Sequence, residues 1–279
     1  MKKESKFPKL VGVIHLPPLP GAPAVAHLSP SDALQLAGDV AIREMKLFEQ
    51  SGFDAVIVEN FGDTPFFKTQ VSLETACAFS IIIAALQATA KIPIGINVLR
   101  NDWQTALTLA SVNDCAFIRV NVLAGVVATD QGLIEGCASA LMRAKAKRYP
   151  ELSVFADVHV KHAKTLSSDD ITLAIEDHII RSHANAVIVS GAGTGKPVDV
   201  ETLKASYAKS KSLKTPLYIG SGVTDSNVEL LKPHCDGVIV SSCLRQNGIA
   251  GAPLDLKRVK SFVNAFRKTQ KTKKTKRKK

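Results

Sequence analysis

The chain has 279 residues, of which 46% are hydrophobic and 22% are charged. A chain of this length and composition folds around a full hydrophobic core, which excludes a mainly disordered, collagen-like or disulfide-framework protein. Its longest apolar run, residues 78–90, is too short and too interrupted by polar side chains to cross a bilayer, so no transmembrane segment is expected.

The net charge of +11 is concentrated at one end of the chain. Nine basic side chains and no acidic one fall in residues 267–279, and removing these nine charges from +11 leaves +2 for the rest. This near-balance disfavours specific nucleic-acid binding by the folded part. Residues 268–279 lack apolar side chains and are predicted to form a disordered basic tail. A solvated terminus, a targeting signal and a peripheral membrane tether all fit this tail.

The five cysteines stand at wide, unrelated spacings, and no C-x-x-C pair occurs. An odd number of scattered cysteines disfavours a disulfide framework. A reducing compartment such as the cytoplasm is therefore expected, although an organelle or a peripheral membrane location also fits.

Short apolar runs rich in Val and Ile recur along the chain, each followed by a stretch with helical spacing. Their starts lie 21 to 45 residues apart, as expected for βα units. The eight runs are Leu10–Leu16, Ala55–Phe61, Pro93–Leu99, Ala116–Leu123, Val154–Val160, Ala186–Ser190, Pro216–Val223 and Gly237–Ser241. The predicted helices are Ser31–Gln50, Ser72–Lys91, Trp103–Ser111, Asp130–Arg148, Leu173–Ser182, Val200–Lys211, Ser226–Leu231 and Pro253–Arg267.

This alternation predicts an α/β protein with a single-domain (β/α)8 TIM barrel over residues 10–267, preceded by an N-terminal extension over residues 1–9. An open doubly wound sheet is the alternative, but it normally shows a glycine-rich dinucleotide fingerprint after its first strand. Here the first strand is followed by PPLPG at residues 17–21, which favours the barrel.

Polar side chains gather at the predicted carboxyl ends of the first five strands, where the active site of such a barrel lies. An outward-facing charge would meet the apolar helices, so these side chains are expected to point into a common mouth. The structural alternative is a buried ion cluster, for example of Arg119 with Asp157 or Glu59, or a packing role for a single histidine. The catalytic candidates are His15, Glu59, Asp157, His159 and Lys161, and the substrate-binding candidates in this group are Asn97, Arg100, Arg119 and Asn121.

Glycine- and hydroxyl-rich segments follow the last three predicted strands. Residues 190–196 (SGAGTGK) fail the P-loop pattern, because Ser190 and Pro197 stand where it requires Gly and Ser or Thr. A glycine loop can still cradle an anion, and the loops after strands seven and eight are the usual phosphate site of these barrels. A simple tight turn is the alternative. The predicted phosphate-binding residues are Gly193, Thr194, Gly220, Ser221, Gly222, Ser241 and Ser242.

The segment after the second strand, residues 60–67, is long and contains Phe61, Phe66 and Phe67. Exposed phenylalanines in a loop fit a lid or a contact with another protein, including a second copy of the chain. An inert surface loop is the alternative.

Eight segments in order along the chain resemble the BtpA/SgcQ family of TIM-barrel proteins. The resemblance implies the barrel fold. For function it implies one of two roles. BtpA-like proteins of cyanobacteria are linked to photosystem I biogenesis, and the SgcQ-like branch carries the label of a nucleotide hydrolase. Relatives occur outside photosynthetic organisms, so the photosystem role is not general. The segments are VGVIHLPPLPGAP (11–23), VENFGDTPF (58–66), INVLRND (96–102), IRVNV (118–122), TDQGLIEG (129–136), ADVHVKHA (156–163), SGAGTGKPVD (190–199) and IGSGVT (219–224).

Three functions follow from these observations. The first is an enzyme that binds and transforms a phosphorylated small molecule, a nucleotide or sugar phosphate, as a hydrolase, lyase or isomerase. In it Asp157 or Glu59 is the general base, and His15 or His159 is the acid. Lys161 is then an electrophile or a Schiff-base former.

The second function is a divalent metal site, and the third involves no catalysis. His15, Glu59, Asp157 and His159 offer ligands for a divalent ion, although no local spacing supports such a site. The non-catalytic alternative is an assembly or stability factor for a membrane protein complex. Its contact surfaces would be the phenylalanine-bearing loop and the basic tail.

Overall fold

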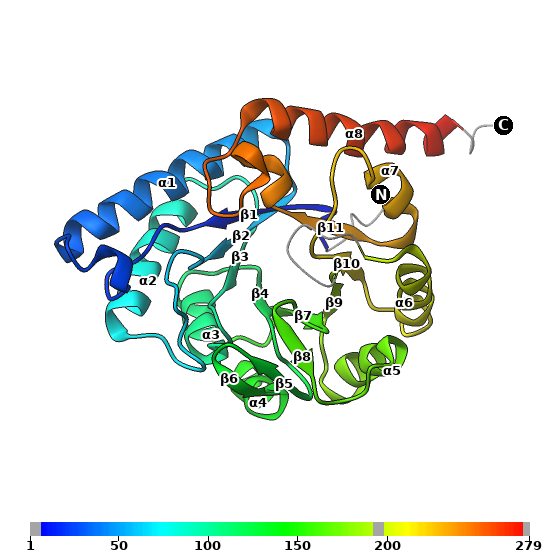
Figure 1. Cartoon of the computed structure of the whole chain (residues 1–279), viewed down its shortest axis with the longest axis horizontal. Coiled ribbons are helices and arrows are strands. Elements are labelled where there is room, and N and C mark those ends of the chain that lie inside the picture. Colours follow the sequence, from blue (N-terminus) through cyan, green and yellow to red (C-terminus); the bar gives the residue numbers. More distant parts are fainter. Residues whose placement is uncertain (1–6, 192–197, 276–279) are drawn as a thin grey trace.

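The strands form one closed parallel barrel (Figure 1). The computed structural model describes residues 7–191 and 198–275, with side chains to residue 268. The order around the ring is β1-β11-β10-β9-β7-β4-β3-β2, so the TIM-barrel prediction is confirmed. The barrel strands are β1 (Leu10–His15), β2 (Ala55–Glu59), β3 (Ile94–Asn97), β4 (Phe117–Val120), β7 (Ser153–Val158), β9 (Ala186–Val189), β10 (Leu217–Ile219) and β11 (Gly237–Val240).

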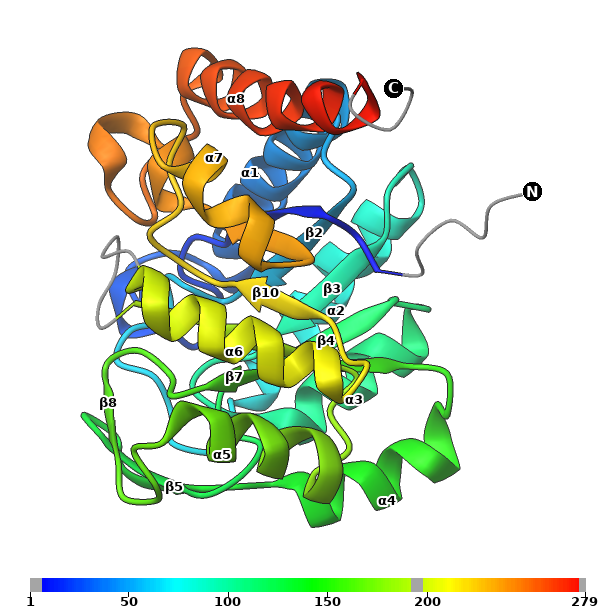
Figure 2. The ribbon, with the colours of Figure 1, turned by 90° about the vertical axis from the view of Figure 1, so that its right-hand side faces the viewer.

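Helices cover the outside of the barrel (Figure 2). They are α1 (Pro30–Ser51), α2 (Leu73–Gln87), α3 (Trp103–Val112), α4 (Ala138–Arg148), α5 (Ile171–Glu176), α6 (Val200–Ser212), α7 (Val228–Leu231) and α8 (Leu256–Thr275). α1 begins after Ser29, whose side chain accepts the Asp32 N–H, and ends at Gly52 in the left-handed conformation. α8 packs against both α1 and α7 and thereby completes the outer ring.

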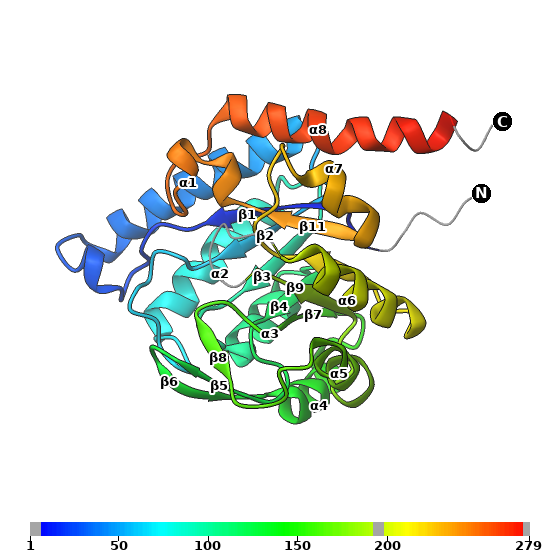
Figure 3. The same cartoon turned by 45° about the vertical axis from the view of Figure 1, so that its right-hand side comes forward.

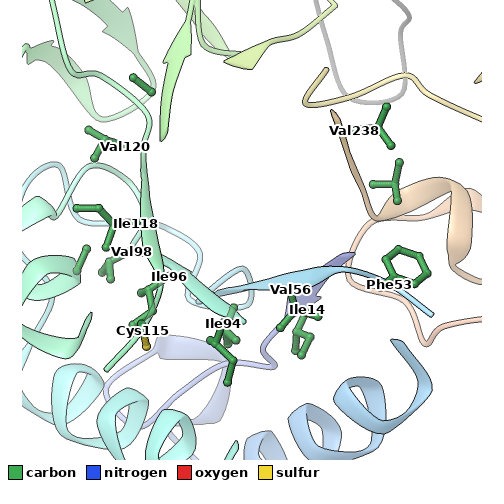
Figure 4. Close-up of a cluster of buried hydrophobic side chains, with 14 of the residues drawn as sticks. Ile14, Phe53, Val56, Ile94, Ile96, Val98, Cys115, Ile118, Val120 and Val238 are labelled. Carbon is green, nitrogen blue, oxygen red and sulfur yellow. The ribbon is translucent and has the colours of Figure 1, made fainter. Parts of the chain in front are cut away.

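Successive side chains of each strand alternate between the inside of the barrel and the helix layer. In β2, Val56 and Val58 pack outward, whereas Ala55 and Ile57 belong to the inner cluster. The same alternation turns Glu59 inward at the carboxyl end of the strand. Figure 4 shows part of the outward set, including Ile14, Val56, Ile94, Ile96, Ile118, Val120 and Val238.

Aromatic side chains fill the barrel interior below the strand ends. Phe117 and Phe155 stack with ring centroids 4.5 Å apart, and the Tyr218 ring lies 5.0 Å from that of Phe155. The Tyr218 hydroxyl donates to the Pro8 carbonyl at 2.7 Å, and Phe7 lies 5.9 Å from Phe155. This packed floor confines the polar side chains to the carboxyl end of the barrel.

A small antiparallel sheet replaces the start of the helix predicted over residues 130–148. β5 (Val126–Thr129) pairs with β6 (Gly132–Glu135) on one side and with β8 (Ala163–Thr165) on the other. Gly132 has a φ of 93°, which suits the tight turn between β5 and β6. The helix itself begins only at Ala138. The small sheet lies beside α4 at the rim of the barrel (Figures 1 and 3).

The apolar side chains of this hairpin explain why the helix prediction was wrong there. Val127 and Ile134 face each other across the β5–β6 pair. Both are buried in a satellite cluster with Val122 and Val160. The strand pair brings Val127 and Ile134, seven positions apart, onto one face with Val122, whereas the helix expected over residues 130–148 included only Ile134.

The carboxyl-terminal helix corrects the predicted domain end. The disordered tail was expected from residue 268, but α8 continues to Thr275. Val259, Phe262 and Phe266 are buried and anchor the helix on the barrel, and lysine has a helix propensity high enough for the helix to continue. Residues 276–279 lie outside the described part of the chain. In the described ranges no helix is long and apolar enough to span a membrane.

Candidate functional site

A cavity of about 160 Å³ opens at the carboxyl ends of the barrel strands. Most of the side chains that the sequence indicated converge on it, from strands all around the ring. The geometry required for a ligand pocket at this end is therefore present. The predicted residues that line the cavity are His15, Glu59, Asn97, Arg100, Arg119, Asn121, Lys161, Gly220, Ser221, Gly222, Ser241 and Ser242.

A buried ion cluster forms one side of the cavity. Arg119 donates from Nε and Nη2 to the two carboxylate oxygens of Asp157, both at 3.1 Å. The Glu59 carboxylate lies 3.8 Å from Nη1 of the same guanidinium. Burial alone would lower the pKa of Arg119, but Asp157 and Glu59 outweigh it and raise that pKa. The ion pairing considered from the sequence is therefore part of the pocket wall.

The two carboxylates differ in how firmly they are held. Asp157 accepts the two bonds from Arg119 and a third from Asn121 Nδ2 at 2.6 Å, and its side chain is only 2% exposed. Glu59 accepts one bond, from Asn97 Nδ2 at 2.7 Å, and lines the cavity. Asp157 borders a smaller neighbouring cavity instead. Glu59 is thus the carboxylate that lines the cavity, whereas Asp157 is held by Arg119 and Asn121.

Two more cations face the cavity from the segments after β3 and β7. Arg100 donates from Nη2 to the Lys161 carbonyl oxygen at 2.6 Å, which ties these segments together. Lys161 directs its Nζ towards the Gly220 carbonyl oxygen, 3.4 Å away. Burial, with the nearby Arg119 charge, lowers the pKa of Lys161 to about 8. This side of the cavity is suited to an anionic ligand.

The loop after β10 presents glycine backbone and a hydroxyl to the cavity. Gly222 has a φ of 72°, which glycine adopts without strain, and Asn227 Nδ2 donates to the Gly222 carbonyl at 2.8 Å. The Ser221 Oγ is shielded from solvent and finds no hydrogen-bond partner among the residues that the structure describes. Buried hydroxyls are nearly always bonded, which makes this unpartnered hydroxyl a candidate contact for a ligand.

His15 is held as a neutral imidazole. The Gly251 N–H donates to Nδ1 at 3.0 Å, which leaves the proton on Nε2, 3.2 Å from the Ser241 hydroxyl. Burial, reinforced by the Arg245 charge, lowers the pKa of His15 well below its ordinary value. The Phe61 ring stacks on the imidazole with centroids 4.1 Å apart. His15 can therefore donate a hydrogen bond from Nε2 but is not suited to act as an imidazolium acid.

Sequence reasoning missed Arg245, whose side chain is 1% exposed behind His15. Its guanidinium bonds both carboxylate oxygens of Glu44, at 2.7 and 2.9 Å, and its Nε donates to the Ser241 hydroxyl at 3.0 Å. It thereby joins α1 to the loop after β11. The sequence does indicate that Glu44 is buried, because this residue lies on the apolar stripe of α1 with Ala41 and Phe48. A buried carboxylate needs a partner of opposite charge. Nothing local identifies Arg245, which is 201 positions away.

Two predicted residues of the described chain, Asp157 and His159, border the smaller cavity rather than this one. His159 follows the last residue of β7 with a φ of 53°, which breaks the strand alternation, and its Nε2 lies 3.1 Å from the Ser168 carbonyl oxygen. It borders the smaller cavity, so it does not point into the common mouth that was expected from the sequence. Gly193 and Thr194 lie outside the described residues.

The proposed metal ligands do not come together either. Across residues 7–191 and 198–268, no group of three or more His, Cys, Asp or Glu side chains is arranged to hold a metal ion. Asp157 is occupied by Arg119 and Asn121, and the Nδ1 of His15 is occupied by a backbone N–H. The mouth of the barrel thus presents Arg100, Arg119, Lys161 and the Glu59 carboxylate to the cavity.

The three phenylalanines after β2 have different surroundings. Phe61 stacks on His15, Phe66 lines the cavity, and Phe67 is 56% exposed. This loop packs directly on the loop after β1, because a Cβ on Gly62 would lie 2.3 Å from the Pro18 nitrogen. The segment is thus a wall of the cavity, with only its tip exposed.

Known proteins resemble this chain in sequence and in fold. The BtpA family profile matches residues 6–268. The chain is 39% identical to the photosystem I biogenesis protein BtpA of Synechocystis, over 96% of this chain and 91% of that protein. It is 41% identical to an uncharacterised protein of Methanocaldococcus jannaschii, over 93% of this chain and 95% of that protein.

Solved structures share the barrel at low sequence identity. N-(5'-phosphoribosyl)anthranilate isomerase from Pyrococcus furiosus has a TM-score of 0.56 at 17% identity, over 93% of this chain and 99% of that one. Thiamine phosphate pyrophosphorylase from the same organism has a TM-score of 0.55 at 12% identity, over 94% and 96%. At such identities the likeness establishes the fold alone.

Proposed function

The chain belongs to the BtpA family, and from this premise we propose that it uses the mouth of its barrel to bind and transform a phosphorylated small molecule, a nucleotide or a sugar phosphate. Family membership supplies the barrel and leaves the chemistry to be argued from the pocket. The observation that carries the proposal is the Ser221 hydroxyl, which is shielded from solvent and unbonded among the described residues. It faces a cavity that Lys161, Arg100 and Arg119 make positive.

The phosphate would lie at the loop after β10. Serine hydroxyls and backbone N–H groups are donors of the kind that phosphate oxygens accept. Ser242, after β11, lines the same wall and adds a second hydroxyl. Ser241 is already engaged with Arg245 and His15, so its part is to hold the histidine rather than the phosphate.

The acid–base chemistry would fall to Glu59. Its carboxylate is presented to the cavity and is held by a single amide bond from Asn97. A base must reach the proton that it removes, and Asp157, with three donors already on it, is less suited than Glu59. The neutral His15 donates from Nε2 to the Ser241 hydroxyl and would hold that wall of the cavity in place, and Asp157 would act as a positioning residue.

Calorimetric titration with inorganic phosphate tests the binding half of this proposal. Phosphate should bind to the wild-type protein and raise its melting temperature by mass action. Ser221→Ala should weaken binding about tenfold or more, because a hydrogen bond to a charged group is removed. Ser212→Ala, at the exposed end of α6, is the matched control and should bind as the wild type does. Equal affinities for all three proteins would refute the assigned phosphate site.

A second candidate function rests on the Synechocystis relative, which is named for photosystem I biogenesis and is 39% identical over 96% of this chain. In this alternative the protein is a non-catalytic assembly or stability factor for a membrane protein complex. Archaeal relatives of 40–42% identity, from organisms without photosystem I, argue that this role is not shared by the whole family. Deletion of the gene with complementation by Ser221→Ala separates the two functions: an assembly factor would be complemented, whereas the enzyme would not.

A further inference from the structure

We propose that Lys161 forms an imine with the carbonyl carbon of a short phosphorylated aldehyde or ketone bound in the mouth of the barrel. This inference rests on the proposed phosphate site and names the substrate class and the reacting group. It selects one of two roles for this lysine, since an ammonium that merely pairs with phosphate would do no covalent chemistry. The choice follows from what surrounds its Nζ.

Of the three cations Arg100, Arg119 and Lys161 that line the cavity, Arg100 and Lys161 have no ion pair with a described carboxylate, and of these two only the lysine nitrogen can become a nucleophile. Arg119 pairs with Asp157 and Glu59, and Arg245 behind the pocket pairs with Glu44. The described contact of the Lys161 Nζ is the carbonyl oxygen of Gly220 at 3.4 Å, a long hydrogen bond. Deprotonation of a lysine without an ion pair costs less free energy than deprotonation of a lysine that pairs with a carboxylate. The Lys161 side chain also lines the cavity, so a ligand can reach its nitrogen.

Burial and the neighbouring arginines favour the neutral amine of Lys161, and together they outweigh the opposing charges of Asp157 and Glu59. The pKa of Lys161 is lowered from 10.5 to about 8, first by burial and then by the Arg119 charge. At pH 7.5 this raises the fraction of neutral amine from about 0.1% to about 24%, and the neutral amine is the nucleophile. The same pocket therefore supplies an attacking nitrogen at neutral pH.

The geometry also limits the size of the ligand. Lys161 contacts the carbonyl of residue 220, and the unbonded hydroxyl belongs to the next residue, Ser221. A phosphate held by Ser221 therefore leaves room for only a few atoms between the phosphorus and a carbon in reach of Nζ. A cavity of about 160 Å³ agrees with a short phosphorylated carbonyl compound.

The imine step balances within the groups present. The Lys161 ammonium gives one proton to a base, and its neutral nitrogen adds to the carbonyl carbon to form a carbinolamine. Loss of the hydroxyl with a returned proton gives the iminium and one water, so Lys–NH₃⁺ and O=CR₂ become Lys–NH⁺=CR₂ and H₂O. Glu59, which lines the same cavity, can hold the proton between the two halves. No oxidant or further reactant is needed.

Reductive trapping with glycolaldehyde phosphate tests the proposal. Borohydride reduces an imine to a stable secondary amine, which intact-mass and peptide mass spectrometry locate on one lysine. We expect Lys161 to be labelled about tenfold or more faster than the exposed Lys164 on β8, because the pKa of Lys161 is lowered and its Nζ lies in the cavity that would bind the aldehyde. Unphosphorylated glycolaldehyde should label it more slowly. Lys161→Arg, which keeps the charge, should abolish this label, whereas Lys164→Arg should leave it unchanged.

Separate measurements distinguish failure of the imine from failure of the phosphate site. Labelling of Lys161 no faster than that of Lys164 would overturn the imine, and inorganic phosphate binding in the same preparation would show that the phosphate site nevertheless stands. Labelling of Lys161 without any preference for the phosphorylated aldehyde would overturn the substrate class. Melting curves for Lys161→Arg and for a second variant, Lys161→Met, confirm that any loss of label is measured on folded protein.

Discussion

Arg245→Met tests how far the stability of the barrel depends on the buried ion pair behind the mouth. A guanidinium has five N–H groups, and here all five find acceptors: both oxygens of Glu44, the carbonyls of Val13 and Ala252, and the Ser241 hydroxyl. Methionine fills much of the same volume but donates none of these bonds. The Glu44 carboxylate, with a side chain only 5% exposed, then stays buried without its counter-charge.

The size of the effect follows from this loss. Removing one partner of a buried ion pair typically lowers the free energy of unfolding by about 3–5 kcal/mol. A domain is stable by only about 5–15 kcal/mol, so the variant should lose a large fraction of its stability. At about 2–4 °C per kcal/mol for a chain of this size, Tm should fall by roughly 6–20 °C. Adding Glu44→Leu removes the orphaned charge and should restore most of the loss, because apolar replacement of a buried pair is often neutral.

Urea unfolding followed by circular dichroism measures these differences, provided that the dependence on urea is the same for all variants. Lys204→Met is the control, since the Lys204–Glu201 pair on α6 has side chains 47% and 79% exposed and should contribute less than about 0.5 kcal/mol. The reasoning fails if Arg245→Met lowers the free energy of unfolding by less than about 1 kcal/mol. It also fails if the double variant is less stable than Arg245→Met alone.

Other buried groups give independent checks on the same contacts. Burial lowers the pKa of His15 and His178 below 6.5, so the unfolded chain binds protons first on acidification. The free energy of unfolding should then fall, as pH drops below 6.5, by up to about 1.4 kcal/mol per pH unit for each histidine; a flat profile in urea titrations between pH 7 and 5.5 would contradict this. Asp157→Asn leaves Arg119 without its bidentate partner and should cost about 3 kcal/mol, and an unchanged Tm would count against the ion cluster. Tyr218→Phe removes a buried hydrogen bond and should cost about 1 kcal/mol in the same assay, with no change in phosphate binding.

Strand-end chemistry could be predicted because it follows from local periodicity. Every second residue of a barrel strand points inward, so Glu59 and Arg119 were assigned to the interior without knowledge of their neighbours. That reasoning fails where the strand stops early. β7 ends at Val158, and the positive φ of His159 takes its side chain away from the face that alternation assigned to it. The His159 side chain is instead held by its contact with the Ser168 carbonyl oxygen, which the alternation of residues along β7 does not indicate.

Features held by long-range contacts could not be predicted from the pattern. The hairpin at 126–135 depends on burial of Val127 and Ile134 against the segment after β7, which periodicity does not indicate. The partnership of Arg245 with Glu44 likewise depends on closure of the ring. α8 shows the converse error, because a run of lysines was taken as disordered although a buried apolar stripe before it anchors a helix.

The polar side chains in the mouth of the barrel fall into two groups that differ in how many hydrogen bonds they make within the protein. On the side of β4 and β7, Arg119, Asn121 and Asp157 bond to one another, and such a network holds its own geometry without a ligand. On the side of β10, the Lys161 Nζ has one long contact and the Ser221 Oγ has none among the described residues. The Asn121 Oδ1 in the first group likewise has no hydrogen-bond partner among the described residues. Unbonded polar groups shielded from water destabilise a fold, so we expect a ligand to supply the missing bonds. The ligand is therefore expected to bind across the cavity, with its anion at the loop after β10 and its reacting atoms between Lys161 and Glu59.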